Sequence, residues 1–145
     1  MAKLFGRFEP SGGRPLVSGR ILIPRTGEAI DLSFLVDTGA EISVLSADDA
    51  LPLGLETLAG PTVTIAGSAG VVSHRTEIAI LQFLVGKRAF LYRTPIVIIS
   101  PSPEFRLLPT LIGRDILHRW DMSYRPSRGR LTFDIVTADE VLRLS

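Results

Sequence analysis

The sequence predicts an all-β fold, a closed barrel or sandwich that forms a single domain. The chain has 145 residues, of which 46% are hydrophobic, enough to bury one core and too few for two. It contains 13 glycines and 10 prolines, which divide it into short segments. Runs of strand length recur between these turn residues, a pattern typical of antiparallel sheets.

The first predicted elements form a hairpin. Residues 1–14 are punctuated by glycine and proline, so we expect a flexible N-terminal arm. The folded domain is expected over 15–136. Its first strand is predicted at 15–24, and its second strand at 29–36, where apolar residues alternate with polar ones.

A strand and a short helix are expected next. Residues 42–45 are apolar except for one serine and continue the strand pattern. Ser46 followed by acidic residues predicts the N-cap of a helix. Pro52 and Gly54 confine that helix to about one turn.

Two hairpins follow. Segments 61–66 and 71–80 alternate as strands around the tip 67–70, which glycines flank on both sides. His74 is expected on the surface of this hairpin. A second hairpin is predicted at 81–92, and a buried strand at 96–99.

The C-terminal part is predicted to contain a helix and a final hairpin. The helix is expected at 114–120, where apolar residues share one face. A strand at 121–124 and the last strand at 130–136 flank a turn. Residues 137–145 are expected to form a C-terminal tail.

The composition excludes several kinds of site. The chain has no cysteine, which rules out disulfides, cysteine-ligated zinc and a thiol nucleophile. His74 and His118 are isolated in the sequence, so we expect no metal and no other cofactor. The net charge is +1, and the arginines of the last third are expected to form a solvated rim, so we expect no nucleic-acid partner.

No targeting or membrane segment is visible in the sequence. The first residues lack the apolar stretch of a secretory signal. No apolar run approaches the roughly 18–20 residues of a membrane span. We therefore expect a soluble, cytoplasmic protein without a membrane partner.

One motif carries chemistry. The apolar run 34–36 leads directly into Asp37, Thr38 and Gly39. A carboxylate at the end of a buried strand is costly unless it is paired, hydrogen-bonded or used. Gly39 permits a tight turn and Thr38 offers a hydroxyl, although three such residues alone most often form an ordinary turn.

A second motif supports a functional interpretation. The segment Leu111-Ile112-Gly113-Arg114 opens the predicted helix. Together with Val36-Asp37-Thr38-Gly39-Ala40, it resembles the active-site frame of the retropepsin-like aspartic proteases. The resemblance covers 15–136. It implies a retropepsin-like closed lobe with a flap hairpin at 61–80 and one short C-terminal helix.

The resemblance implies that the protein is an aspartic endopeptidase, which hydrolyses peptide bonds in peptides or proteins. It also implies a role for each residue that matches the two motifs. Asp37 would be the catalytic acid or base, while Thr38 would bond across the active site and Gly39 would shape its backbone. Structural support is expected from Ile112, Gly113 and Arg114, with an ion pair between Glu41 and Arg114. The residues expected to bind substrate are Ala40, Glu41, Ile42, Ile65, Ala66, Gly67, Ser68, Ala69 and Gly70, with further apolar pocket residues around 97–101 and Pro109.

The chemistry needs a second carboxylate, and the chain has one Asp-Thr-Gly. Asp115 lies near Gly113, but the corresponding position in the resembled fold points away from the active site. A homodimer that brings together two copies of Asp37 is the simpler solution. The last strand is the expected dimer interface, which the tail 137–145 could alter or replace.

Ala40 suggests a pH preference. A serine or threonine there could donate a hydrogen bond toward the carboxylates, and alanine cannot. We therefore expect a less acidic pH optimum than that of pepsin-like relatives.

Two alternatives remain open on the sequence alone. The chain could be a non-catalytic retropepsin-fold module for dimerisation or peptide binding. It could also be an unrelated β-barrel in which Asp-Thr-Gly occurs by chance.

Overall fold

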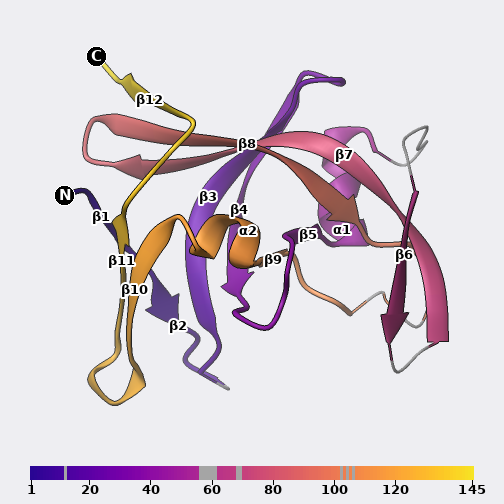
Figure 1. The fold of residues 1–145 in the computed structure, drawn as a ribbon, viewed down its shortest axis with the longest axis horizontal. Coiled ribbons are helices and arrows are strands. Elements are labelled where there is room, and N and C mark those ends of the chain that lie inside the picture. Colours follow the sequence, from indigo (N-terminus) through magenta and orange to yellow (C-terminus); the bar gives the residue numbers. More distant parts are fainter. Residues whose placement is uncertain (12, 56–61, 68–69, 102, 104, 106) are drawn as a thin grey trace.

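The computed structural model describes residues 1–145 except 12, 56–61, 68–69, 102, 104 and 106. Strands dominate and form two sheets around one core (Figure 1). The prediction of an all-β lobe with a short C-terminal helix is confirmed.

Two long hairpins form the body of the molecule. β3 (Pro15–Ile23) pairs antiparallel with β4 (Glu28–Val36), and β7 (Gly70–Val85) pairs antiparallel with β8 (Arg88–Ile98). The hairpins join where β3 meets β7, with Ile21 opposite Leu81. Both residues are fully buried, because inward and outward side chains alternate along each strand.

Short elements follow each of the two hairpins. β5 (Val44–Leu45) is shorter than the predicted strand 42–45 and leads into α1 (Ala47–Ala50) and the 3-10 turn η1 (Leu51–Leu53). Ser46 caps α1 as predicted, its hydroxyl accepting a hydrogen bond from the backbone of Asp49 at 3.1 Å. β9 (Leu111–Ile112) precedes α2 (Arg114–Leu117).

Helix α2 is shorter than the predicted helix 114–120. The chain leaves the helix at His118, and β10 (Trp120–Arg125) already begins at Trp120. Trp120 is buried as a strand residue, so packing in the core, rather than helical periodicity, determines where this helix ends.

A small second sheet contains the N-terminal segment. β1 (Lys3–Phe5) pairs with β11 (Arg130–Ile135), which also pairs with β10 in the order β1-β11-β10, and the turn η2 (Pro126–Arg128) joins β10 to β11. β2 (Arg7–Phe8) pairs with β3. The prediction of a flexible arm is therefore wrong, because backbone pairing and the burial of Leu4 hold this segment in place.

The position of β11 also corrects the expected interface. β11 lies in the middle of its sheet, with β1 on one edge and β10 on the other. A second copy therefore cannot pair with it. The tail contributes β12 (Glu140–Arg143), which pairs with β8.

The hairpin predicted over 61–80 is present in the backbone, and its role as a flap stays a prediction. β6 (Thr62–Gly67) pairs antiparallel with β7 from Thr62 opposite Arg75 to Gly67 opposite Gly70. The hairpin extends at the end of the molecule opposite to the two termini (Figure 1). Ser68 and Ala69 at its tip lie outside the described residues.

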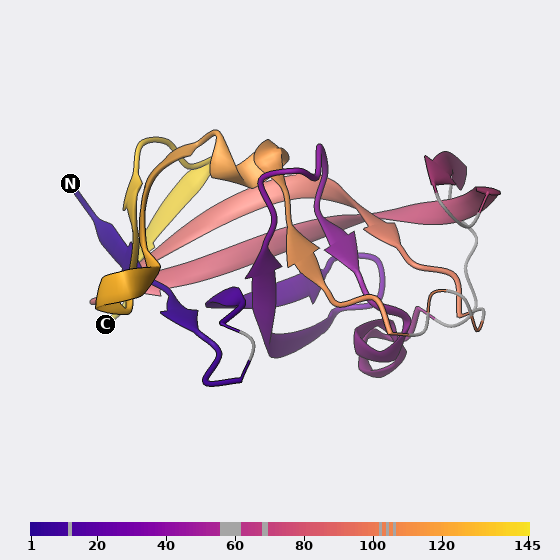
Figure 2. The same cartoon turned by 90° about the horizontal axis from the view of Figure 1, so that it is seen from below.

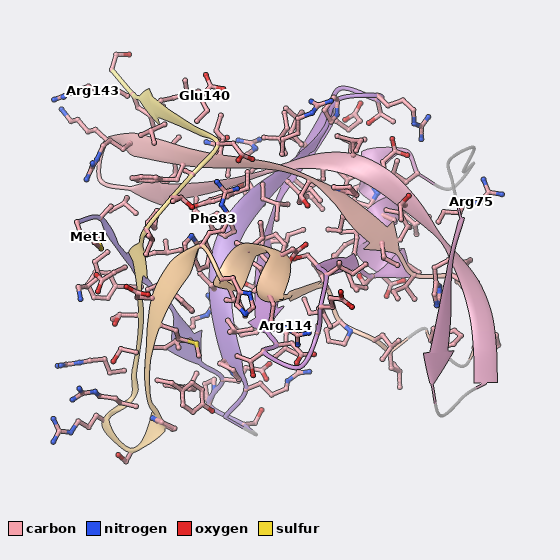
Figure 3. All side chains as sticks on the ribbon, viewed as in Figure 1. Met1, Arg75, Phe83, Arg114, Glu140 and Arg143 are labelled. Atoms are coloured by element: carbon pink, nitrogen blue, oxygen red, sulfur yellow. The ribbon has the colours of Figure 1, made fainter. Side chains whose placement is uncertain are left out.

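An aromatic cluster fills the core near the C-terminal segment. The ring of Trp120 packs edge-on against Phe83, with centroids 4.9 Å apart, and also contacts Phe133 (Figure 3 shows Phe83 in the interior). The indole of Trp120 donates to the Tyr92 hydroxyl at 2.8 Å, and that hydroxyl donates to the carbonyl of Thr137 at 2.8 Å. Burial raises the pKa of Tyr92, so its hydroxyl remains a donor.

His74 is buried, which corrects the prediction of a surface residue. Its side chain is 3% exposed, and its ring packs edge-on against Phe105 with centroids 5.2 Å apart. Nδ1 accepts a hydrogen bond from the backbone of Ser100 at 3.1 Å, which requires the neutral ring. Burial lowers the pKa of His74 below its usual value.

We expect His74 to make stability depend on pH. Because its pKa is lower in the folded chain than in the unfolded one, its contribution is complete above about pH 6.5 and is lost as the pH falls from there toward the folded pKa. His74→Asn keeps an acceptor near Ser100 and does not titrate. Urea unfolding between about pH 5 and 8 should show wild type losing stability relative to the variant at low pH. Parallel curves would show that the histidine has no such role.

Candidate active site

The two sequence motifs meet because β9 lies parallel beside β4. Val36 is opposite Ile112 in this pairing. The backbone of Asp37 donates to the carbonyl of Ile112 at 3.1 Å, which continues the ladder one residue beyond β4. Asp37 therefore sits where a buried strand becomes an exposed loop.

The carboxylate of Asp37 is held on one side. Oδ1 accepts a hydrogen bond from the backbone of Gly39 at 2.9 Å. A Cβ on Gly39 would lie 3.2 Å from that oxygen, so glycine keeps the close approach free. Within the described part of the chain, no hydrogen bond to Oδ2 is found, so this oxygen remains available to a ligand or a partner.

Gly113 allows the loop and the start of α2 to touch. A Cβ at this position would lie 2.7 Å from the carbonyl oxygen of Ile42 and 2.9 Å from that of Ala40. Both are backbone atoms that cannot move independently. The backbone of Arg114 donates to Ala40 at 2.8 Å, and the backbone of Asp115 donates to Glu41 at 3.2 Å.

The side chain of Arg114 does not pair with Glu41, contrary to the prediction. Its guanidinium donates instead to the carbonyl of Thr38 at 2.9 Å (Figure 3 places Arg114 beside the β4–β5 loop). No salt bridge joins Glu41 to Arg114 among the described residues. The backbone of Glu41 is fixed by Asp115, and its side chain is exposed to solvent.

Sequence reasoning missed Ser43, which links the two motifs from inside. Ser43 is fully buried. Its hydroxyl donates to Oδ1 of Asp115 at 2.8 Å and accepts from the backbone of Gly113 at 3.1 Å, while its backbone donates to Oδ2 at 2.9 Å. The sequence does contain one signal for this role. Ser43 is the one polar residue in the apolar run 42–45, and a polar side chain that is buried needs hydrogen-bond partners.

Asp115 is therefore occupied by a structural contact. Both of its carboxylate oxygens accept hydrogen bonds from Ser43, and Oδ1 also accepts from the backbone of Ile116 at 2.9 Å. Both oxygens of Asp115 therefore have partners within the protein.

The other predicted site residues are distributed over the loop and the flap. Thr38, Gly39 and Ile42 are exposed, whereas Ile112 and Gly113 are buried. In the β6–β7 hairpin, Ile65, Ala66 and Gly67 belong to β6, and Gly70 begins β7.

The pocket expected around 97–101 is only partly compatible with the structure. Val97 and Ile99 are buried in the core and cannot line an open cleft. Leu107 and Leu108 are exposed in the segment that leads to β9, at 91% and 44%.

Within the described residues, no three histidine, cysteine, aspartate or glutamate side chains gather as metal ligands would. The part of the chain that the structure describes also has no helix with the length and apolarity to cross a membrane.

We expect Ser43→Ala to destabilise the fold by about 1–3 kcal/mol, because it leaves the buried backbone N–H of Gly113 without its acceptor and removes one of the three donors to Asp115. The exposed hydroxyl of Ser18, which accepts from Arg7 at 2.8 Å, provides the control Ser18→Ala with a much smaller expected loss. Urea unfolding of both variants measures the difference. Equal losses would contradict a structural role for the Ser43 network.

Comparison with solved structures identifies the fold. A retropepsin-like aspartic protease from Rickettsia conorii is similar over 90% of this chain and 89% of its own, with a TM-score of 0.62 and 16% sequence identity. The EIAV protease in an inhibitor complex shares 23% identity over 76% of this chain and 90% of its own, with a TM-score of 0.47. The first of these two likenesses, with its TM-score of 0.62, shows that the fold is retropepsin-like.

Comparison with sequences gives the family. No curated protein matches the chain. The model of the family described as gag-polyprotein putative aspartyl protease matches residues 27–119, a range that includes Asp37 and Gly113. Since this match spans more than half of the sequence, the chain belongs to the gag-polyprotein putative aspartyl protease family.

Proposed function

We propose that the protein is an aspartic endopeptidase that hydrolyses peptide bonds as a homodimer, with a water molecule held between two Asp37 carboxylates. The observation that carries this proposal is the setting of Asp37. Its backbone is fixed by Ile112 and its Oδ1 by Gly39, while its other oxygen lies unengaged at an exposed loop. Because one oxygen of this carboxylate, at the end of a buried strand, has no partner among the described residues, a role in chemistry explains the residue better than a contribution to stability does.

A second copy supplies the missing group. Asp115, the carboxylate of the second motif, is bound to Ser43 and supports the loop instead. A two-fold axis that passes near the Asp37 loop would bring two equivalent carboxylates together. Family membership supports this arrangement, because the match includes both motifs.

The paired carboxylates would divide the chemistry. Two carboxylates about 3 Å apart share one proton, as in other aspartic proteases, because both cannot be ionised together. The ionised member takes a proton from the water as it attacks the peptide carbon, and the protonated member donates to the carbonyl oxygen. Collapse of the tetrahedral intermediate breaks the carbon–nitrogen bond, and a carboxyl proton passes to the leaving nitrogen.

The remaining residues would position the substrate. Thr38 lies beside Asp37 and would bond across the dimer axis, while Gly39 and Ala40 would present backbone groups to the peptide. The exposed side chain of Ile42, in the loop that follows Asp37, supports a preference for apolar residues beside the scissile bond. The flap tip, residues 67–70, would close over the peptide.

Asp37→Asn should abolish proteolysis. The amide is nearly isosteric and cannot act as a general base, so we expect kcat/KM to fall by at least about 10²–10⁴-fold with unfolding free energy little changed. The measurement is cleavage of an unstructured protein such as casein between about pH 3 and 7, with and without pepstatin.

The exposed Asp48 of α1 provides the matched control Asp48→Asn, which should retain full activity. Cleavage that survives in Asp37→Asn would refute the proposed role of Asp37. Absence of cleavage in wild type, together with a stable dimer, would favour a non-catalytic dimerisation or peptide-binding module.

Ala40→Ser should shift the acidic limb of the pH profile. A hydroxyl beside the paired carboxylates could stabilise their ionised form, so we expect kcat/KM to hold to a lower pH, by up to about one unit. Ala47→Ser on α1 is the control and should leave the profile unchanged. The profile is measured with one peptide substrate at fixed ionic strength. A shift toward higher pH in Ala40→Ser would contradict this reasoning.

A further inference from the structure

The small sheet β1-β11-β10 has a hollow on its outer face. The odd-numbered residues of β11 from 131 to 135 are apolar and buried in the core, so the even-numbered ones lie on the opposite face. There Arg130, Thr132 and Asp134 line a hollow of about 540 Å³, together with residues of β1 and β10. A volume of this size is typical of sites for small molecules.

This hollow is separate from the candidate active site. None of the described residues that line it belongs to the Asp37 loop or to the β6–β7 hairpin. Figures 1 and 2 both place the β10–β11 hairpin at the end of the molecule where the N-terminus lies, and the β6–β7 hairpin at the other end. A ligand in the hollow would therefore not occupy the space of the proposed peptide substrate.

Two arginines face each other at one end of the hollow. Arg125 of β10 is directly opposite Arg130 of β11, in the pair that flanks the turn η2. Both residues are exposed, and neither forms a salt bridge in the part of the chain that the structure describes. Like charges that are directly opposite destabilise an antiparallel pair. An anion between the two guanidinium groups would remove this repulsion and accept hydrogen bonds from both.

A buried hydroxyl lies next to this arginine pair. Thr132 follows Arg130 on the outer face of β11 and is only 6% exposed. Its hydroxyl has no hydrogen-bond partner among the residues that the structure describes, although a buried hydroxyl usually has one. Ser123, directly opposite Thr132, also lines the hollow. Both hydroxyls can therefore donate hydrogen bonds to a ligand that the arginines hold.

The charges around the hollow favour a dianion. Lys3 is opposite Asp134 and pairs with its carboxylate at 3.3 Å. The lining residues comprise three cations, Lys3, Arg125 and Arg130, and one carboxylate, which leaves a net charge of +2. A carboxylate ligand would balance half of this charge, whereas a phosphate monoester carries about two negative charges at neutral pH. Asp121, which is opposite Asp134, would keep the anion near the arginine pair.

An aromatic ring is exposed beside the polar groups. Phe5 of β1 is directly opposite Thr132 and lines the hollow, and it is 71% exposed. Aromatic rings pack favourably against other rings, either offset-stacked or edge-on. The organic part of a phosphate ester would therefore find an apolar surface next to the place where its phosphate is bound.

We propose that the outer face of the small sheet binds a small aromatic phosphate monoester. The phosphate group lies between Arg125 and Arg130 and accepts a hydrogen bond from the Thr132 hydroxyl, and the aromatic part covers Phe5. The binding site goes beyond the proposed protease function and does not depend on it.

Phenyl phosphate is a probe that has both features of the ligand. Titrated into the ¹⁵N-labelled full chain at about pH 7.5 and low salt, it should bind with a dissociation constant of about 1 mM or lower. The largest NMR shifts are expected at the amides of 130–132. Inorganic phosphate lacks the ring and should bind about three- to tenfold more weakly. An absence of shifts in this segment at about 10 mM phenyl phosphate would overturn the proposal.

Three arginine variants separate a built site from a general positive field. Arg125→Gln and Arg130→Gln each remove one guanidinium and should each weaken phenyl phosphate binding about tenfold or more. Arg128→Gln removes the same charge from an exposed residue of η2 that does not line the hollow, and should change the affinity by less than about threefold. Equal losses in all three variants would show a non-specific field and overturn the site.

Thr132→Val tests the unpartnered hydroxyl. Valine has a similar shape and leaves no buried hydroxyl without a partner, so the unfolding temperature of the free protein should stay the same or rise. The affinity for phenyl phosphate should nevertheless fall about three- to tenfold. A lower unfolding temperature combined with unchanged affinity would show a purely structural hydroxyl and overturn its place in the site.

The chemistry of the ligand is tested with a diester. Methyl phenyl phosphate carries one negative charge and should bind at least about tenfold more weakly than phenyl phosphate. Equal affinity would overturn the assignment to a dianion and favour a phosphodiester such as a nucleic-acid backbone. Phe5→Ala should reduce the affinity for phenyl phosphate to that for inorganic phosphate, and an unchanged affinity would overturn the role of the ring.

The result is independent of proteolysis. Asp37→Asn should bind phenyl phosphate as wild type does, even where it abolishes cleavage. Wild-type protein that binds phenyl phosphate and cleaves nothing would support this site and refute the protease. Cleavage that depends on Asp37, without phenyl phosphate binding, would support the protease and overturn this site.

Discussion

The candidate site depends on a close backbone approach at Gly113. With no Cβ in the way, the carbonyls of Ala40 and Ile42 come close to the start of α2, and Arg114 and Asp115 donate their backbone N–H groups to the same loop. The loop that carries Asp37 is thereby held by the start of α2, through Arg114 and Asp115, and by β9, through Ile112. A side chain at position 113 would have to push this loop away, because both contacts are backbone atoms.

The Ser43–Asp115 contact works in the same place from the interior. The Ser43 hydroxyl bonds both to the Asp115 carboxylate and to the backbone N–H of Gly113, so these buried polar groups have partners. A carboxylate next to a catalytic motif can thus be structural, and its hydrogen-bond partners distinguish it from one that is available for chemistry. The contrast between Asp115, bound on both oxygens, and Asp37, bound on one, is the clearest electrostatic feature of this region.

Much of the fold could be predicted from the sequence, because turn residues and alternating apolar positions mark the hairpins. The two motifs were expected to belong to one frame, and the parallel pairing of β4 with β9 brings them together. Burial of His74, pairing of the N-terminal segment and the partner of Arg114 could not be predicted, since each depends on what another part of the chain brings nearby. His74, for example, is buried by Phe105, which lies far from it in sequence. Local patterns contain no information about such neighbours.

The loop that carries Asp37 is fixed through its main chain and hardly through its side chains. Glu41 and Ile42 are anchored by their carbonyl groups or by adjacent backbone, while their side chains extend into solvent. Replacement of these side chains would therefore leave the backbone geometry of the Asp37 loop in place. Such a separation between the fixed backbone and the exposed side chains lets the surface of the loop diverge among descendants of one ancestral chain while the loop itself is kept.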